Sequence, residues 1–192
     1  TVSLDGPMAL NDPIRGEGVF AKVREAIFAR DANDGTTVML QMAVTRENAP
    51  GLEDFMAEVA DWPINGVAFA FYVPTVNDSS GQDWPDLRER DEVLDRVIAL
   101  KRQYPDIIRS RIATLELMKS DVAVETTGKH GENCVLRRDT QPLYMGTGGQ
   151  FETPFCCYGN DVDCSRCGSY EVFNRAYLAS QGQDKGARYG RD

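Results

Sequence analysis

Apolar residues along the chain are grouped in two ways, which are typical of strands and of helices. Short apolar runs occur at Thr1–Leu4, Val38–Val44 and Val67–Val73. Their length and their β-branched and aromatic residues predict strands. The third run is apolar throughout and stops at Pro74, as expected of a strand covered on both faces.

Helical periodicity follows each of these runs. Helices are predicted over Gly18–Arg30, from about Asn48 to Val59, and over Leu87–Gln103, with a further helical segment at Ile107–Ser120. Asn48 is the expected N-cap of the second helix. Its apolar face has helical spacing and consists of Leu52, Phe55, Met56 and Val59.

Alternation of strands and helices predicts an α/β fold built around a parallel sheet. Three parallel strands leave two edges with unpaired backbone groups. Because the chain also opens directly in a strand, we expect residues 1–120 to be part of a larger (β/α) barrel or sheet.

The pattern changes after Ser120, and residues 121–180 are predicted to form a separate extension. A hairpin is expected from Val135–Met145 and Phe151–Phe155, joined by a glycine-rich turn. A short helix is expected over Tyr170–Ser180. Residues 181–192 are polar and predict a flexible tail.

Charge and composition exclude some classes of function. The chain has 192 residues, a formal net charge of −9 and 42% hydrophobic residues. This acidity argues against a nucleic-acid partner, which needs a basic surface. No apolar run is long enough for a membrane helix, so we expect no membrane partner and a cytoplasmic location.

Five cysteines supply the candidate chemistry: Cys134, Cys156, Cys157, Cys164 and Cys167. An odd number, clustered late in the chain, is not typical of a secreted disulfide framework. Cys164 and Cys167 form a C-x-x-C pair that can share a metal, and a four-sulfur shell suits zinc or an iron–sulfur cluster. Only one of the adjacent Cys156 and Cys157 is expected to be a ligand, and the sequence leaves open which. His130 is an alternative ligand.

The opening motif resembles a known superfamily. The residues Val2-Ser3-Leu4-Asp5-Gly6-Pro7, then Asp12-Pro13-Ile14-Arg15-Gly16 and Phe20-x-x-Val23, resemble the fourth strand and following helix of radical S-adenosylmethionine (SAM) enzymes. The segment from Val44 to Asn48 resembles the end of their fifth strand. The cysteine region resembles their auxiliary-cluster extension, called SPASM or twitch. The sequence contains no C-x-x-x-C-x-x-C motif, which binds the SAM-cleaving cluster in that superfamily.

This resemblance implies a partial radical SAM barrel with a C-terminal cysteine-rich, cluster-binding extension. It implies that Ser3 and Arg15 contact SAM, with Asp5 and Asn48 as further candidates; turn formation by Asp5 and helix capping by Asn48 are the alternatives. The implied cofactors are a [4Fe–4S] cluster and SAM. The implied partners are a small-molecule or peptide substrate and an electron donor such as flavodoxin or ferredoxin.

The implied reaction is hydrogen abstraction from substrate by a 5′-deoxyadenosyl radical. Without the segment for the first cluster, we expect that the chain cannot cleave SAM alone. The rival interpretation is a zinc-stapled interaction module without enzymatic activity.

Overall fold

A three-stranded parallel sheet forms the centre of the molecule in the computed structural model, which describes residues 1–31 and 35–183. Strand β2 pairs with β1 on one side and with β3 on the other. The predicted parallel α/β sheet is therefore confirmed, although each strand is shorter than expected. The bounds are β1 Val2–Ser3, β2 Met39–Val44 and β3 Gly66–Phe71.

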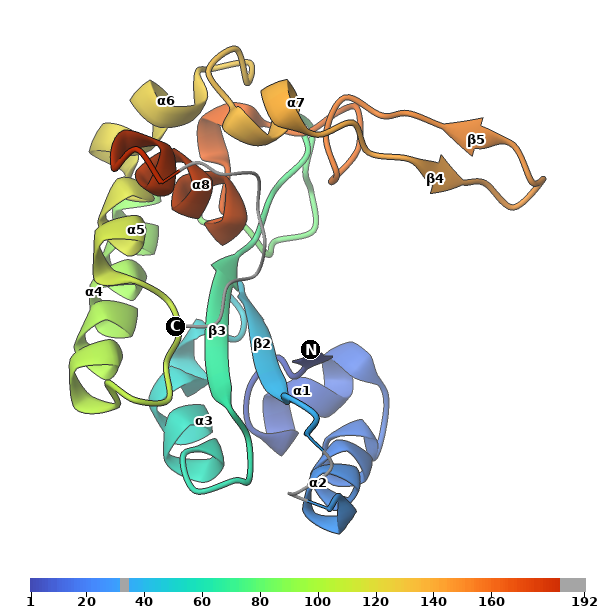
Figure 1. Cartoon of the computed structure of the whole chain (residues 1–192), viewed down its shortest axis with the longest axis vertical. Helices are drawn as coiled ribbons and strands as arrows, with labels where there is room; N and C mark the ends of the chain where they lie inside the picture. The colour runs from blue at the N-terminus through green and yellow to red at the C-terminus, as the bar shows by residue number, and fades with distance from the viewer. Residues whose placement is uncertain (32–34, 184–192) are drawn as a thin grey trace.

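Helices form an arc around one side of this sheet (Figure 1). Three of them match the predicted segments closely: α2 Val19–Ala29, α3 Leu52–Val59 and α4 Leu87–Gln103. A further helix, α1 Met8–Arg15, was not predicted. The predicted apolar face of α3 is confirmed, since Leu52, Phe55, Met56 and Val59 are all buried.

The prediction that the third strand is covered on both faces is wrong for the described residues. In β3, Val67, Phe69 and Phe71 are buried, whereas Ala68 and Ala70 are only half-buried. Strand β2 alternates in the same way, with Gln41 and Ala43 exposed. Because successive side chains of a strand point to opposite faces, the sheet has one face packed on helices and one more open face.

The segment predicted as one helix over Ile107–Ser120 is divided into three parts. Ile108 forms an isolated parallel bridge with Val67, beside β3. Helix α5 spans Ile112–Leu117, and helix α6 spans Ser120–Thr127, across the predicted boundary after residue 120.

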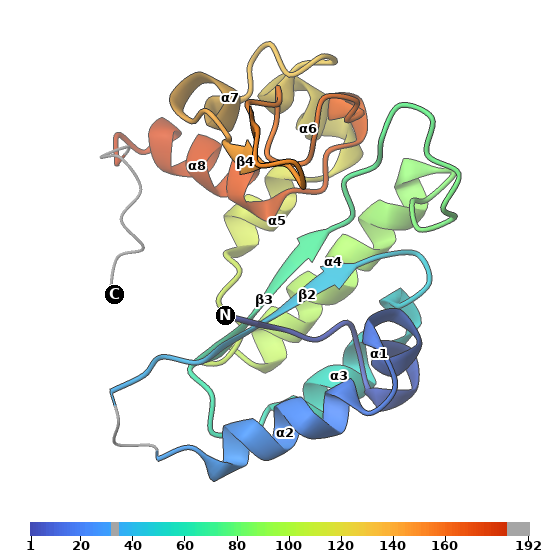
Figure 2. The ribbon, with the colours of Figure 1, turned by 90° about the vertical axis from the view of Figure 1, so that its right-hand side faces the viewer.

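The cysteine-rich part of the chain lies beyond the ends of the strands (Figure 2). It contains α7 Val135–Asp139, β4 Tyr144–Met145, β5 Phe151–Glu152, the 3₁₀ turn η2 Cys164–Arg166 and α8 Tyr170–Ser180. The α8 prediction is confirmed. The predicted hairpin is much shorter than expected, because residues 135–139 are helical and each strand has two residues. Most of the predicted tail, residues 184–192, lies outside the described residues.

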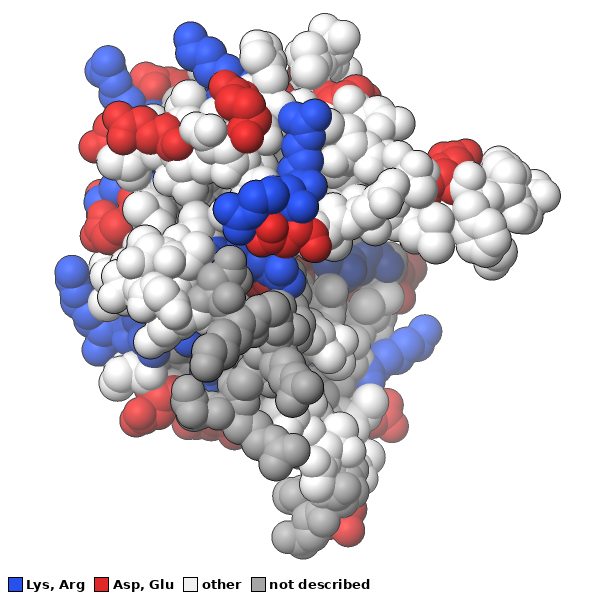
Figure 3. All heavy atoms as spheres, turned by 45° about the horizontal axis from the view of Figure 1, so that its top comes forward, with Lys and Arg blue, Asp and Glu red and all other residues white. Residues whose placement is uncertain are grey.

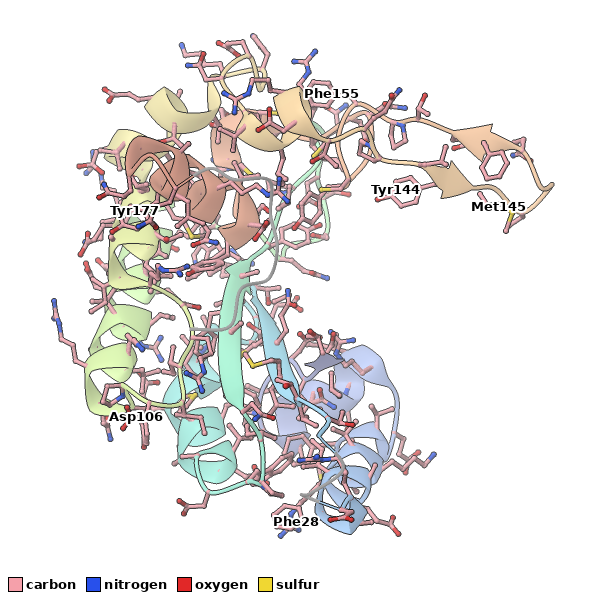
Figure 4. All side chains as sticks on the ribbon, viewed as in Figure 1. Phe28, Asp106, Tyr144, Met145, Phe155 and Tyr177 are labelled. Atoms are coloured by element: carbon pink, nitrogen blue, oxygen red, sulfur yellow. The ribbon has the colours of Figure 1, made fainter. Side chains whose placement is uncertain are left out.

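The β4–β5 hairpin projects away from the rest of the molecule and is almost without charged residues (Figure 3). Its large side chains are exposed: Leu143, Tyr144, Met145 and Phe151. Figure 4 shows Tyr144 and Met145 on this arm, while Phe155 lies where the arm joins the body. Arg137 stacks over the Phe155 ring, 4.1 Å from its centroid, and secures the base of the arm.

Candidate metal centre

All five cysteines line one cavity. They come from the start of α7, from the loop after β5 and from η2, and all five are free thiols. The cavity has a volume of about 50 Å³, several times the ~10–15 Å³ that one water molecule needs. Its other walls are mostly apolar and include Val73, Leu136, Phe155, Val162 and Val172. Cysteines that lie far apart in sequence therefore line the same cavity.

This cavity lies at the carboxyl end of β3. Phe71 N–H donates to Gly168 C=O at 2.8 Å, and Asp163 N–H donates to Pro74 C=O at 2.9 Å. An antiparallel bridge between Thr75 and Val162 continues the contact. In α/β folds, ligand sites form at the carboxyl ends of parallel strands, so the cysteines occupy the edge where a site is expected.

The C-x-x-C turn is formed by local hydrogen bonds. The Asp163 carboxylate accepts from Ser165 N–H at 3.0 Å and from Ser165 Oγ at 2.6 Å. This cap starts the η2 turn, which brings Cys164 and Cys167 to the same cavity. Gly131 allows a close approach from the other side, because a Cβ at this position would lie 3.0 Å from Cys164 Sγ.

Four of the five cysteines, Cys134, Cys156, Cys164 and Cys167, are half-buried, and Cys157 is exposed. Negative charge on neighbouring thiols would oppose ionisation of Cys167 and of Cys164. Cys157 belongs to the same group, because loss of water contact and then its neighbour Cys156 raise its pKa to about 11. Its carbonyl accepts a hydrogen bond from the Tyr144 hydroxyl of the hairpin.

The environment keeps the Cys164 and Cys167 thiols protonated. Loss of water contact, followed by the neighbouring thiols Cys156 and Cys134, raises the pKa of Cys164 to about 11. Loss of water contact raises the pKa of Cys167 to about 12, and a hydrogen bond from the Ser169 backbone partly offsets it. Metal binding must therefore displace protons from these sulfurs, which makes affinity increase with pH.

The sulfurs surround the cavity without converging on a single point. Within residues 1–31 and 35–183, no three or more His, Cys, Asp or Glu side chains are grouped closely enough to hold one metal ion. A tetrahedral zinc site requires four ligand atoms about 2.0–2.3 Å from one centre. The donor set is chemically right for a thiolate-bound metal or cluster. His130 is exposed and does not line the cavity.

The residues predicted to contact SAM lie at the edge of the sheet on the β1 and β2 side. Ser3 is exposed on the open face and pairs in register with Gln41. Arg15 Nε forms a 2.7 Å ion pair with the buried Asp5, whose other oxygen accepts from Ala43 N–H at 3.3 Å. Asp5 therefore holds Arg15 in place at the end of β1.

Asn48 has a structural position and does not cap a helix with its side chain. The amide oxygen accepts from Thr45 N–H at 2.8 Å, and the amide nitrogen donates to Ala43 C=O at 2.9 Å. The residue is 1% exposed and precedes the 3₁₀ turn η1 Ala49–Gly51. The predicted N-cap hydrogen bond is thus replaced by bonds that close the turn after β2.

The burial of one charged residue near the cysteines was not predicted from the sequence. The acidic and basic stretch from Glu89 to Asp95 is predicted to be a solvated helix face, but Arg90 within it is 1% exposed. Its guanidinium reaches the C-x-x-C turn, where Nη1 donates to Arg166 C=O at 2.9 Å. Helical periodicity is the one available signal, because Arg90 lies three and four residues before the apolar Val93 and Leu94.

Comparisons with known proteins leave the family open. No protein-family model, curated protein or solved structure matches this chain. Among the described residues, no helix has the length and apolar character needed to cross a membrane.

Proposed function

We propose that this chain is part of a radical SAM enzyme and that its cysteine cavity holds an auxiliary [4Fe–4S] cluster. One observation carries the proposal: five free cysteines line a single cavity at the carboxyl end of a parallel strand. Thiolates are the usual ligands of such clusters. The apolar walls would limit the access of water to the cluster and thereby influence its potential.

The ligands in this proposal are Cys134, Cys156, Cys164 and Cys167. Each of these four is half-buried, whereas Cys157 is exposed. Cys157 is left as a fifth, exposed thiol at the rim. The sequence leaves open which of the two adjacent cysteines is a ligand, and this proposal assigns Cys156.

The open face of the sheet supports the SAM part of the proposal. Asp5 binds the Nε of Arg15, which leaves the terminal nitrogens of the fork to receive a carboxylate such as that of SAM. Ser3, Gln41 and Ala68 form a row of small and polar side chains in one register across the open face. SAM would supply the radical chemistry together with the reduced SAM-cleaving cluster, whose binding motif this sequence does not contain, and Ser3 and Arg15 would orient SAM. The substrate class, small molecule or peptide, stays open.

A matched pair of cysteine variants tests the proposal. Cys156→Ser and Cys157→Ser change adjacent residues in the same way. After anaerobic reconstitution with iron and sulfide, we expect wild type and Cys157→Ser to have the same iron content and the same visible absorption. We expect Cys156→Ser to lose most of both. Equal retention or equal loss in the two variants would contradict the ligand set.

A zinc-stapled interaction module is the second candidate, since four thiolates also suit zinc. The two are separated by purifying the protein without oxygen: brown protein with iron and sulfide supports the cluster, and colourless protein with one tightly bound zinc supports the module.

A further inference from the structure

Arg90 is a buried cation beside the proposed cluster site. It lies in the first turn of α4 and is the largest fully buried side chain among the described residues. Burying a charge is unfavourable unless an opposite charge or hydrogen bonds compensate for it. The position of Arg90 therefore calls for a partner.

The hydrogen bonds of Arg90 go to neutral groups. Nη1 donates to Arg166 C=O at 2.9 Å and Nη2 to Met118 C=O at 3.1 Å, while the buried Nε has no hydrogen-bond partner. Among the described residues, no carboxylate is hydrogen-bonded to its guanidinium. The side chain thus connects α4 to the C-x-x-C turn and to the segment before α6 without neutralising its own charge.

The charged groups around Arg90 already have direct partners. Asp83 forms a 2.5 Å ion pair with Arg166, which also donates to Trp84 C=O. Asp91 accepts from Ser120 N–H at 3.0 Å. Asp91 and Asp83 attract the Arg90 charge, as a Cys167 thiolate would, and Arg166 opposes it. The two carboxylates offset the two guanidinium groups, and ligand thiolates would bring further negative charge close to Arg90.

We infer that Arg90 is the built-in counter-cation of the thiolate-bound cluster, and that it favours the reduced state. This inference rests on the proposed function. A guanidinium stays charged at all relevant pH values, and a reduced cluster carries one more negative charge than an oxidised one. A fixed positive charge that holds the Cys164–Cys167 turn therefore raises the reduction potential. Arg90 acts through the ligands and is a positioning residue.

The test compares three reconstituted full-length variants with wild type by redox titration followed by electron paramagnetic resonance. Arg90→Met removes the charge at similar volume, Arg90→Lys keeps it, and Arg88→Met removes an exposed charge on the same helix. We expect Arg90→Met to shift the equilibrium at least tenfold toward the oxidised cluster, which lowers the potential by about 59 mV for one electron. Arg90→Lys and Arg88→Met should stay close to wild type.

Each other outcome has a definite meaning. If Arg90→Met takes up no cluster while Arg90→Lys does, the requirement for charge is supported. If Arg90→Met keeps the wild-type potential, or if both Arg90 variants lose the cluster while Arg88→Met retains it, the counter-cation role is overturned and the cluster proposal stands. If wild type itself binds no cluster, both proposals fail.

Discussion

Gly168 packs the cysteine-rich region against the end of β3, and replacing it with alanine tests this packing directly. A Cβ at this position would lie 2.2 Å from the Tyr72 carbonyl oxygen and 2.6 Å from both the carbonyl carbon and oxygen of Phe71. These are backbone atoms of the end of β3, so no side-chain rotation relieves the overlap. The turn that follows Cys167 must move away from the strand.

The cost has two parts. Overpacking in a close-packed region costs about 1–3 kcal/mol, and separation of the two segments also lengthens the 2.8 Å hydrogen bond from Phe71 N–H to Gly168 C=O, worth about 1 kcal/mol. We expect a loss of about 3 kcal/mol in the free energy of unfolding. For a chain of this size this lowers the melting temperature by about 6–12 °C.

Urea denaturation followed by circular dichroism measures the loss, and Gly148→Ala is the matched control. The nearest atom to a Cβ at Gly148 is the tip of the Gln150 side chain, which can turn away. We expect the control to lose less than about 0.5 kcal/mol. A similar small loss in Gly168→Ala would refute the close packing of the C-x-x-C turn against β3.

Two further predictions concern the sheet and its helices. Phe69→Ala should lower the free energy of unfolding in urea by about 3–5 kcal/mol, because this side chain is fully buried on the helix-covered face. Ala70→Ser, on the more open face, should change it by less than about 0.5 kcal/mol. Equal losses in the two variants would contradict a sheet with one buried and one open face. Glu53 binds Arg96, and this hydrogen-bonded contact lowers the pKa of Glu53 from 4.5. The pair's contribution to stability is therefore present above pH ~4.5 and lost as the pH falls through the lowered pKa. Glu53→Gln should make the acid side of the stability curve shallower, and an unchanged acid side would show that the pair does not join α3 to α4.

The parallel sheet and its longer helices could be predicted because their periodicity is strong. Leu87–Gln103 has helical spacing over many turns, and the structure has α4 with these same bounds. The apolar run Val67–Val73 is harder to interpret. In this run, large and small apolar residues alternate. A pattern that only separates apolar from polar residues therefore does not show that Ala68 and Ala70 lie on the more open face.

Short elements escaped prediction for physical reasons. Helix α1 contains Pro13, which normally disfavours a helix interior. Helix α7 has five residues, which are too few to show a period, and the sequence predicts part of a hairpin there. Helices of this size are stabilised by tertiary packing and not by their own propensity.

The candidate site could be predicted in composition but not in arrangement. The late cluster of cysteines was visible in the sequence, and the structure brings all five to one cavity. The partial burial of four of them and the exposure of Cys157 depend on how three distant segments pack. The burial of Arg90 depends on the same packing, because its sequence neighbours are charged.

Elemental analysis of protein purified and kept without oxygen tests the central claim most directly. Iron, acid-labile sulfide and zinc are counted per chain in wild type, with Cys134→Ser as the variant that lacks one proposed ligand. The proposal predicts about four iron and four sulfide per chain after reconstitution, little zinc, and strong loss of iron in the variant. One zinc per chain with no sulfide, or iron that is retained equally without Cys134, would contradict it.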